Sequence, residues 1–152
     1  MPSSSYIKFT GQRSGVIAGP STNKFHAHEW PLTSMTHEVS SPRDPQSGLP
    51  TGRRQHHAMV VTLPLATNIP LLWNVMVTNE NLSRVVLSFN SNGADGQSQD
   101  VYTVTLTNAS ISDMIEVASG STPAFQVSMT YQKIQWDTTG GVSALDDWES
   151  QA

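Results

Sequence analysis

The sequence contains no cysteine among its 152 residues, and only 13% of its residues are charged. The first absence excludes a disulfide framework, a thiolate metal site and a nucleophilic thiol. The scarcity of charge, combined with 37% hydrophobic residues, is not the composition of a disordered chain. The formal net charge of −4 argues against general nucleic-acid binding, which requires a basic surface.

Long hydrophobic runs are also missing. The chain starts MPSSSYIKFTG, which lacks the apolar segment of a signal peptide, and no stretch approaches the roughly 18 apolar residues of a membrane span. We therefore expect neither a signal peptide nor membrane insertion. A chain of this length fits one core, so we expect residues 1–152 to form a single domain.

What the sequence does have is alternation of apolar and polar residues with a period of two, the spacing of half-buried strands. It runs through six segments, 6–11, 28–40, 56–63, 84–90, 100–117 and 125–136. The fifth segment changes phase near Asn108, which places Ala109, Ile111 and Ile115 on one face, and the sixth changes phase after Tyr131. Strands that change phase bend from one sheet into another, so we predict a mainly β fold with strands that turn corners.

One segment, 67–80, has helical spacing instead. Thr67 or Asn68 can cap this helix, and Pro70 falls in its first turn, where a missing N–H costs nothing. Two further segments have neither period. Residues 41–54 form a long loop rich in proline, and residues 137–152 are expected to be an extended C-terminal arm.

All five histidines lie in the first 57 residues, and two of them are adjacent in the segment RRQHHAMVV, 53–61. Three of them, His26, His28 and His57, could reach a zinc ion, although no HExxH motif supports such a site. Ordinary histidines at a strand edge are favoured, with His57 on the face of Met59. No nucleophile elbow or phosphate-binding glycine loop is present, so we predict neither an enzyme nor a cofactor.

Several segments resemble the Hcp family, the tube proteins of bacterial type VI secretion. They are YIKFTG, HHAMVVTLPLATNIPLLWNVMVTNE, VVLSFNSN, YTVTLTNASISDM, VSMTYQKIQW and DDW, in this order from Tyr6 to Trp148. The resemblance implies a small β-barrel of two sheets with one short α-helix on its side. The sequence departs from the family pattern at Leu63, Pro64 and Ala66, before the helix, where many members carry charged residues.

The resemblance also implies an assembly. Family members form homohexameric rings that stack head to tail into a tube, inside a contractile sheath and below a VgrG-type spike protein. They carry small effector proteins in the lumen, assemble in the cytoplasm and leave the cell without a signal peptide. The segment 28–40 contributes to the inner wall in the family, so its polar face is expected to face the lumen and contact cargo: Ser34, Thr36 and Glu38.

Charge is distributed unevenly along the sequence. Residues 1–54 carry six basic and three acidic side chains, and the remainder carries two basic and nine acidic ones. Since stacked rings join two different faces, opposite potentials favour the contact. We expect the loop 41–54 to contribute Arg43, Arg53 and Arg54 to one rim of the ring. Candidates for the other rim are Asp95, Asp100 and Asp113.

Two alternatives remain open at this stage. The first is a tube protein of a related contractile phage tail or extracellular injection device, which would share the fold and the ring. The second is a stand-alone β-barrel binding module or zinc hydrolase built around the histidines.

Overall fold

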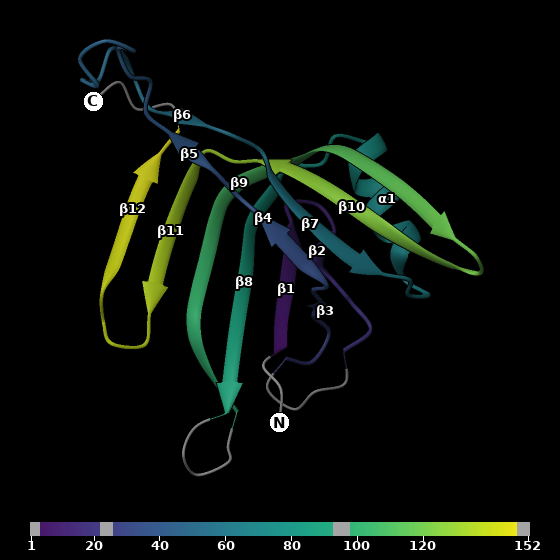
Figure 1. Cartoon of the computed structure of the whole chain (residues 1–152). Helices are drawn as coiled ribbons and strands as arrows, with labels where there is room; N and C mark the ends of the chain where they lie inside the picture. The colour runs from purple at the N-terminus through teal and green to yellow at the C-terminus, as the bar shows by residue number, and fades with distance from the viewer. Residues whose placement is uncertain (1–3, 22–25, 93–97, 149–152) are drawn as a thin grey trace.

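The computed structural model of the chain describes residues 4–21, 26–92 and 98–148 (Figure 1). One helix, α1 (Ile69–Val77), is accompanied by twelve strands in this part of the chain. The strands are β1 (Ser4–Gly11), β2 (Gly15–Ile17), β3 (Trp30–Pro31), β4 (Ser34–Thr36), β5 (Val39–Ser40), β6 (Gln55–His56), β7 (Met59–Pro64), β8 (Leu82–Asn92), β9 (Ser98–Ser119), β10 (Thr122–Thr130), β11 (Lys133–Thr138) and β12 (Ser143–Asp147). The expectation of a mainly β fold with one short helix is confirmed.

The main sheet follows the order β2-β1-β8-β9-β10-β7-β4, with β11 attached to β9 and β12 attached to β11. Its centre is β9, which spans 22 residues. The first half of β9 pairs with β8 and β11, and the second half pairs with β10. The strand therefore passes through both layers, and the two-sheet architecture is confirmed. Among the described strands the layers do not close into a complete barrel, because β2 and β4 end the path of paired strands.

The bend in β9 lies where the sequence predicts it. Asn108 has φ of +52°, in the left-handed region, and the buried face switches from Val104 and Leu106 to Ala109 and Ile111. The expectation for Ile115 was wrong, since its side chain is 46% exposed. A register shift between Ile111 and Asp113 turns the strand over once more and buries Met114 instead.

The helix α1 covers one end of the core with its buried side chains Ile69, Leu72 and Val75. Proline stands in its first turn, as expected, and Asn68 is the residue before the helix. Asn68 makes no side-chain cap, however: its Oδ1 accepts a hydrogen bond from Thr67 Oγ1 at 2.9 Å, and its Nδ2 donates to the Ala18 carbonyl at 2.8 Å. This contact fixes the start of the helix to the end of the β1–β2 region instead.

The expected strand 28–40 is broken into three pieces, β3, β4 and β5. It begins late, because His28 adopts φ of +64° in a turn. It then changes partners: Leu32 N donates to Ser5 O of β1, and Thr33 N donates to Thr62 O of β7. The segment 30–36 thus crosses from one layer to the other, which a single continuous strand does not do.

Two smaller expectations were also wrong. His57 does not share a face with Met59, because the chain leaves the strand between β6 and β7, and His56 is the buried histidine of the pair. Within the expected extended arm 137–152, residues Ser143–Asp147 fold back as β12 against β11. Among the described residues, no helix is long and apolar enough to cross a membrane.

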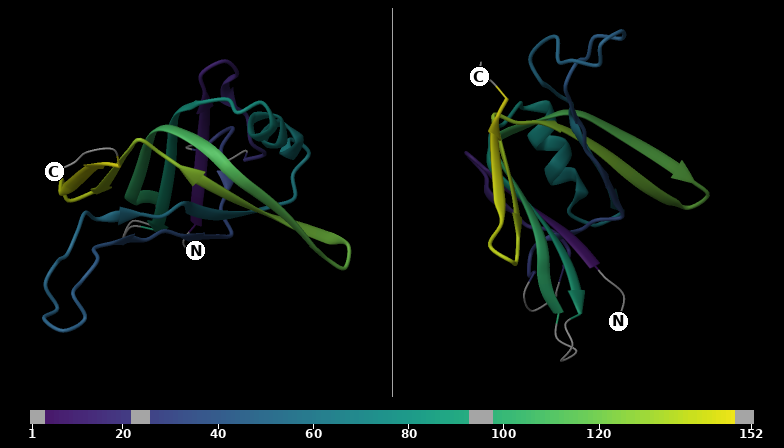
Figure 2. Two further views of the ribbon diagram at one scale, coloured as in Figure 1. Left: turned by 90° about the horizontal axis from the view of Figure 1, so that it is seen from above. Right: turned by 60° about the vertical axis from the view of Figure 1, so that its left-hand side comes forward.

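Two segments project from the body on opposite sides (Figures 1 and 2). One is the loop 41–54 between β5 and β6, and the other is the end of the β9–β10 hairpin, residues 113–124. The core lies between them.

Candidate functional site

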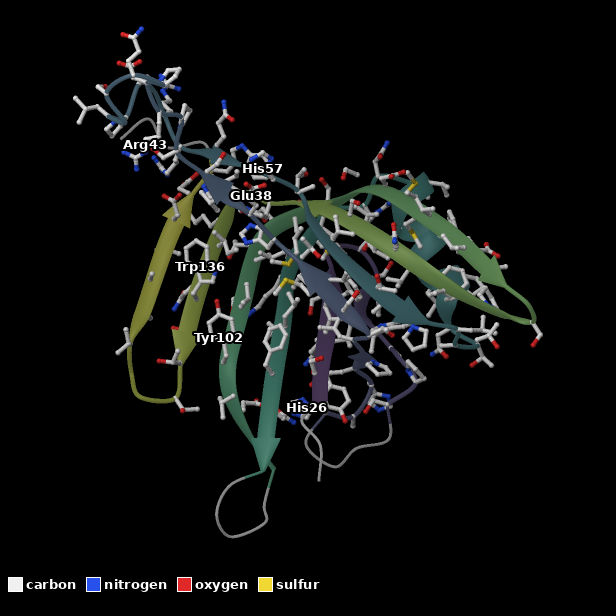
Figure 3. The ribbon with its side chains drawn as sticks, viewed as in Figure 1. His26, Glu38, Arg43, His57, Tyr102 and Trp136 are labelled. Carbon is white, nitrogen blue, oxygen red and sulfur yellow. The ribbon has the colours of Figure 1, made fainter. Side chains whose placement is uncertain are left out.

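The polar face predicted on the segment 34–38 is present. Ser34, Thr36 and Glu38 are exposed, while Met35 and His37 are half-buried. The first two lie on β4, and Glu38 follows near the stem of the projecting loop (Figure 3). Because β4 pairs only with β7 among the described strands, this polar face lies beside a free sheet edge.

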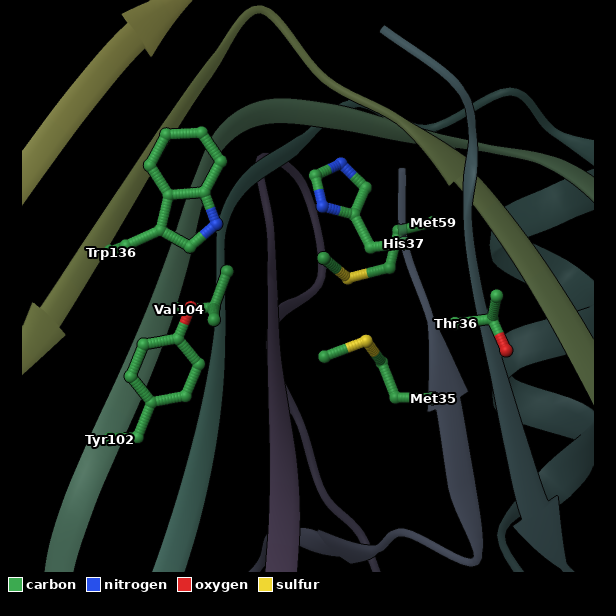
Figure 4. A pocket seen from close by; sticks show the side chains of 7 residues that line it. All are labelled: Met35, Thr36, His37, Met59, Tyr102, Val104 and Trp136. Carbon is green, nitrogen blue, oxygen red and sulfur yellow. The ribbon is translucent and has the colours of Figure 1, made fainter. Parts of the chain in front are cut away.

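Behind this edge, an open cleft of about 440 Å³ separates the two layers. It is lined from four elements by Met35, Thr36, His37, Met59, Tyr102, Val104 and Trp136. Figure 4 shows the rings of Tyr102 and Trp136 on one wall, opposite Met35 and His37. The rings of His37 and Trp136 are 6.3 Å apart between centroids. The cleft marks the place where the barrel is incomplete.

The projecting loop has internal structure. An isolated bridge joins Arg43 to Pro50, and the Asp44 carboxylate accepts hydrogen bonds from Ser47 Oγ at 2.8 Å and from Gln46 N at 3.2 Å. The Ser47 hydroxyl and the Gln46 N–H hold the pKa of Asp44 below its usual value. The bridge and this turn hold a defined tip on the loop, where the Arg43 side chain is exposed.

The three arginines of this loop differ in their surroundings. Arg43 and Arg53 are exposed, whereas Arg54 binds the C-terminal strand. Arg54 Nη2 donates to Asp146 Oδ1 at 2.7 Å and to the carbonyl of Asp147 at 3.1 Å, and Arg54 Nε also donates to Asp146. The Arg54 guanidinium lowers the pKa of the Asp146 carboxyl. Arg54 therefore contacts its own subunit, and a role for it between rings is untested.

The two adjacent histidines have different environments. The His57 side chain is 45% exposed and lies 3.1 Å from Ser40 Oγ. The His56 side chain is 1% exposed; its Nδ1 lies 2.7 Å from Tyr131 Oη and its Nε2 lies 2.7 Å from Asp146 Oδ2. His37 Nε2 lies 2.7 Å from the same Tyr131 oxygen. Burial raises the pKa of Tyr131 and, together with the nearby His56 and His57, lowers the pKa of His37.

The histidines proposed as zinc ligands are not brought together. His26 is buried at the end of the molecule opposite His57 and stacks on Tyr6 at 4.5 Å between ring centroids (Figure 3). Its nitrogens lie 3.2 Å from Glu29 Oε1 and 3.1 Å from Asp100 Oδ1. His28 is exposed nearby. No group of three or more His, Cys, Asp or Glu side chains among the described residues is placed so that it could hold a metal ion.

The acidic residues expected on the opposite rim lie at separate places. Asp100 contacts His26, and Asp113 is exposed on the projecting hairpin. Asp95 lies outside the described residues.

Sequence reasoning missed Glu80, which is 4% exposed. Its carboxylate accepts hydrogen bonds from the main-chain N–H groups of Arg13 and Ser14 at 3.1 and 2.8 Å and from Ser14 Oγ at 2.8 Å. The Ser14 donors lower the pKa of Glu80. A side chain at Gly11 would overlap this carboxylate, since an added Cβ would stand 2.1 Å from Glu80 Oε2. No local signal predicts a contact between residues 66 positions apart.

The described residues form an open, two-layered β fold with one helix on its side. A free sheet edge lies beside a polar face, and two segments project from the body, so the fold is that of a small, open β-barrel protein with exposed edges. A family described as "Type VI secretion system effector, Hcp" matches residues 6–138. The chain belongs to this family of type VI secretion tube and effector proteins.

Known proteins align with this chain over nearly its whole length. The "Major exported protein" of Pseudomonas aeruginosa is 31% identical, with 99% of this chain and 98% of that protein aligned. A solved Hcp protein superposes with a TM-score of 0.89 at 27% identity, covering 98% of this chain and 99% of that one. The secreted protein Hcp3 from Pseudomonas aeruginosa superposes with a TM-score of 0.81 at 25% identity, covering 98% and 100%. The predicted family is confirmed.

Proposed function

We propose that this chain is the inner-tube subunit of a bacterial type VI secretion system. Six copies close into a ring, and the rings stack head to tail into a tube that carries small effector proteins. A VgrG-type spike caps the tube and a contractile sheath surrounds it. The subunit assembles in the cytoplasm and is exported through the system without a signal peptide. Its role is structural, with no catalytic step and no cofactor.

The observation that carries this proposal is the pair of free edges in one layer. The layer consists of β4, β7, β10 and the second half of β9, and among the described strands its two outer members have no partner on one side. Free edges expose main-chain donors and acceptors and need to be paired or covered. Copies related by rotation bring the edge at β9 of one subunit to the edge at β4 of the next, so that a closed ring removes both.

The projecting hairpin fits the same arrangement. Ile115 and Val117 are 46% and 50% exposed on the β9 strand of the hairpin, beyond the body of the subunit (Figure 2). On the opposite side, the open cleft presents aromatic and methionine side chains (Figure 4). A neighbour's hairpin arriving at this side would bury apolar surface on both partners, at roughly 25 cal/mol per Å² of apolar area.

The polar face Ser34, Thr36 and Glu38 is proposed to face the lumen. It belongs to the layer whose edges meet in the ring, and its side chains are exposed in the subunit. A wall of hydroxyl groups and a carboxylate offers hydrogen bonds to many different protein surfaces without a large apolar patch. Such a lining suits the transient retention of cargo.

Stacking is assigned to the loop 41–54. Arg43 and Arg53 are exposed on a segment that stands clear of the body, and the acidic excess of the later sequence provides the opposite potential. Arg54 contributes differently, because its contact with Asp146 fixes the base of the loop.

The ring is tested by negative-stain electron microscopy and light scattering of the purified protein. We expect six-fold rings and a hexameric mass, and a stable monomer at micromolar concentration would refute the proposal. The lumen is tested by single thiols, since the chain has no cysteine of its own. Thr36→Cys should react with a small maleimide but poorly with a large polymer-linked one. Thr105→Cys, on the opposite layer, should react with both, and equal labelling of both positions by the large reagent would contradict the lumen assignment.

A further inference from the structure

The side chains around Tyr131 form a continuous chain of hydrogen bonds. It runs from His37 through Tyr131 and His56 to Asp146, with each of the three donor–acceptor distances at 2.7 Å. Arg54 binds both carboxylate oxygens of Asp146. These residues come from four places in the sequence: the segment after β4, the stem of the projecting loop, the junction of β10 and β11, and β12.

An aromatic ring closes the cluster. Trp148 follows β12 and stacks on His56 with ring centroids 5.3 Å apart and planes 24° from parallel. It also meets Tyr131 edge to face at 5.0 Å. Its main-chain N–H donates to Gln132 O at 2.7 Å. The cluster therefore holds the last described residues and the base of the loop against the same end of the body.

The direction of each hydrogen bond follows from Asp146. Arg54 keeps this carboxylate ionised, so it only accepts, and His56 must donate to it from Nε2. In neutral His56, Nδ1 then has a lone pair and accepts the Tyr131 hydroxyl proton. The Tyr131 oxygen is left to accept a hydrogen bond from His37 Nε2. Every group in the chain is satisfied with both histidines neutral.

Protonation of one of the two histidines is compatible with this chain of hydrogen bonds. If His37 is protonated, its Nε2–H still donates to Tyr131. If His56 is protonated instead, it donates to the Tyr131 oxygen, and the hydroxyl proton turns to a neutral His37. Two added protons are not compatible, because both histidines then present N–H groups to one oxygen, and the Tyr131 hydroxyl proton has no acceptor among them. Two positive rings also share one small, partly buried site.

The two histidines have different surroundings. His56 faces the Asp146 carboxylate, which Arg54 also binds. His37 faces Tyr131 and Trp136 and lies near His56 and His57, and burial and these two histidines lower its pKa. Glu38 lies 3.9 Å from His57, and Asp147 offers its carbonyl to Arg54. Protonation of His37 is thus disfavoured while the hydrogen bonds around Tyr131 are intact.

We propose that His37, Tyr131, His56, Asp146 and Trp148 form an acid-sensitive latch, which fixes the projecting loop 41–54 to the C-terminal strand and opens when both histidines are protonated. The latch is a property of the single subunit. Its effect on tubes rests on the proposed function, since the released loop is the segment assigned to stacking. Acidification would then loosen ring-to-ring contacts while the strand-paired ring remains.

The test uses nitroxide labels on the full chain, which has no native cysteine. Gln46→Cys places one label on the loop and Ala144→Cys places the other on β12, both at exposed positions. Labelled chain is diluted with unlabelled chain so that pulsed electron resonance reports distances within one subunit. At about pH 7.5 we expect one narrow distance distribution, and at about pH 5, below the usual histidine pKa, a distribution roughly twice as wide.

Three variants make the result decisive. His37→Gln keeps an amide donor for Tyr131 but cannot take the second proton, so its distribution should stay narrow at the lower pH. His57 is the exposed neighbour that takes no part in these hydrogen bonds, so the distance distribution of His57→Gln should broaden in acid as that of the parent does. Asp146→Ala should be broad at both pH values. A parent that stays narrow, a His37→Gln that broadens equally, or a narrow Asp146→Ala would overturn the latch.

The tube proposal fails in a different way. Negative-stain images of the same samples show whether rings form. A chain without rings that still broadens in acid would refute the tube and retain the latch.

Discussion

The two projecting segments of the subunit are held by different kinds of bonds. The hairpin 113–124 is regular, and main-chain pairing between β9 and β10 continues to Ser119 and Thr122. The loop 41–54 is closed at its base by the short main-chain pairing of β5 with β6, but this ribbon pairs with no other described strand. Side chains attach it to β12, namely Arg54 and His56 against Asp146. Main-chain ladders do not titrate, whereas carboxylates and histidines do. A single subunit thus combines a permanent projection with a conditional one.

Their surfaces differ in the same sense. The hairpin exposes apolar side chains at Ile115 and Val117, and the loop exposes cations at Arg43 and Arg53. Apolar contacts are not weakened by screening, while contacts between exposed charges are screened over about 10 Å at 0.1 M salt. If the hairpin closes rings and the loop joins them, solution conditions can dissolve tubes without dissolving rings.

The largest expected effect follows from charging the hairpin. Ile115→Asp with Val117→Asp should abolish rings at micromolar concentration, because each apolar side chain contributes about 1.5–3 kcal/mol when fully buried and every subunit contact loses both. Light scattering measures the mass, and circular dichroism checks that the β fold is retained. Leu49→Asp, the same change at a 63% exposed position on the loop, should leave rings intact. Hexamers formed by the hairpin variant would show that ring closure does not use this surface.

A smaller loss is expected from breaking the anchor of the loop. Asp146→Ala leaves the buried His56 Nε2–H without its acceptor, which costs about 1–3 kcal/mol. Urea unfolding measures this difference. Asp113→Ala removes an exposed carboxylate from the hairpin and should change the free energy of unfolding by no more than about 0.5 kcal/mol. If both variants changed the free energy of unfolding by the same amount, side-chain bonds would not hold the loop more than they hold the hairpin.

The stability of the fold should also depend on pH through His37, which belongs to the cluster that holds the loop. The pKa of His37 is lower in the folded chain than in the unfolded one, so the unfolded chain binds protons more readily in acid. Stability should therefore fall as the pH drops through the unfolded value of about 6.5 and level off below the lowered folded pKa. Urea titrations at a series of pH values measure this slope. His37→Gln should flatten it, and an unchanged slope in that variant would contradict the assignment.

The same urea titrations should show a second pH range in which the free energy of unfolding changes. The lowered pKa of Asp146 stabilises the fold above the unfolded carboxyl value of about 3.9, and this contribution is lost only as the pH falls through the folded pKa.

The smallest effect per contact is expected for stacking. Exposed ion pairs are worth under about 1 kcal/mol each, but every ring junction repeats them. Arg43→Glu with Arg53→Glu should shorten tubes in electron micrographs, as should raising salt from about 0.1 to 0.5 M. Lys8→Glu with Arg84→Glu reverses the same amount of charge on the body and should leave tube length unchanged. Tubes indifferent to both the loop variant and salt would exclude these arginines from stacking.

Much of the fold could be predicted, because local patterns determine it. The helix around Leu72 and the bend at Asn108 both follow from the spacing of apolar residues. Ile115 was misplaced because a one-residue register shift leaves no mark in an alternating pattern. The segment 28–40 was misjudged because its change of partner between Leu32 and Thr33 is decided by strands that lie elsewhere in the sequence.

The site was less predictable, for a related reason. Exposure of Ser34, Thr36 and Glu38 follows from alternation. The partnership of Arg54 with Asp146 does not, because the two residues are 92 positions apart and meet only through β12. From the sequence alone, Arg54 was therefore grouped with the exposed arginines of the loop, Arg43 and Arg53.

The length of β9 has a mechanical consequence. One uninterrupted strand of 22 residues enters in one layer and leaves in the projecting hairpin of the other. A pull on the hairpin tip is transmitted along this strand and reaches the ladders with β8 and β11 without passing through a loop. In these ladders the hydrogen bonds lie across the strand, so the part of the force that runs along the first half of β9 loads them together in shear. A subunit built in this way behaves as a stiff element under axial load.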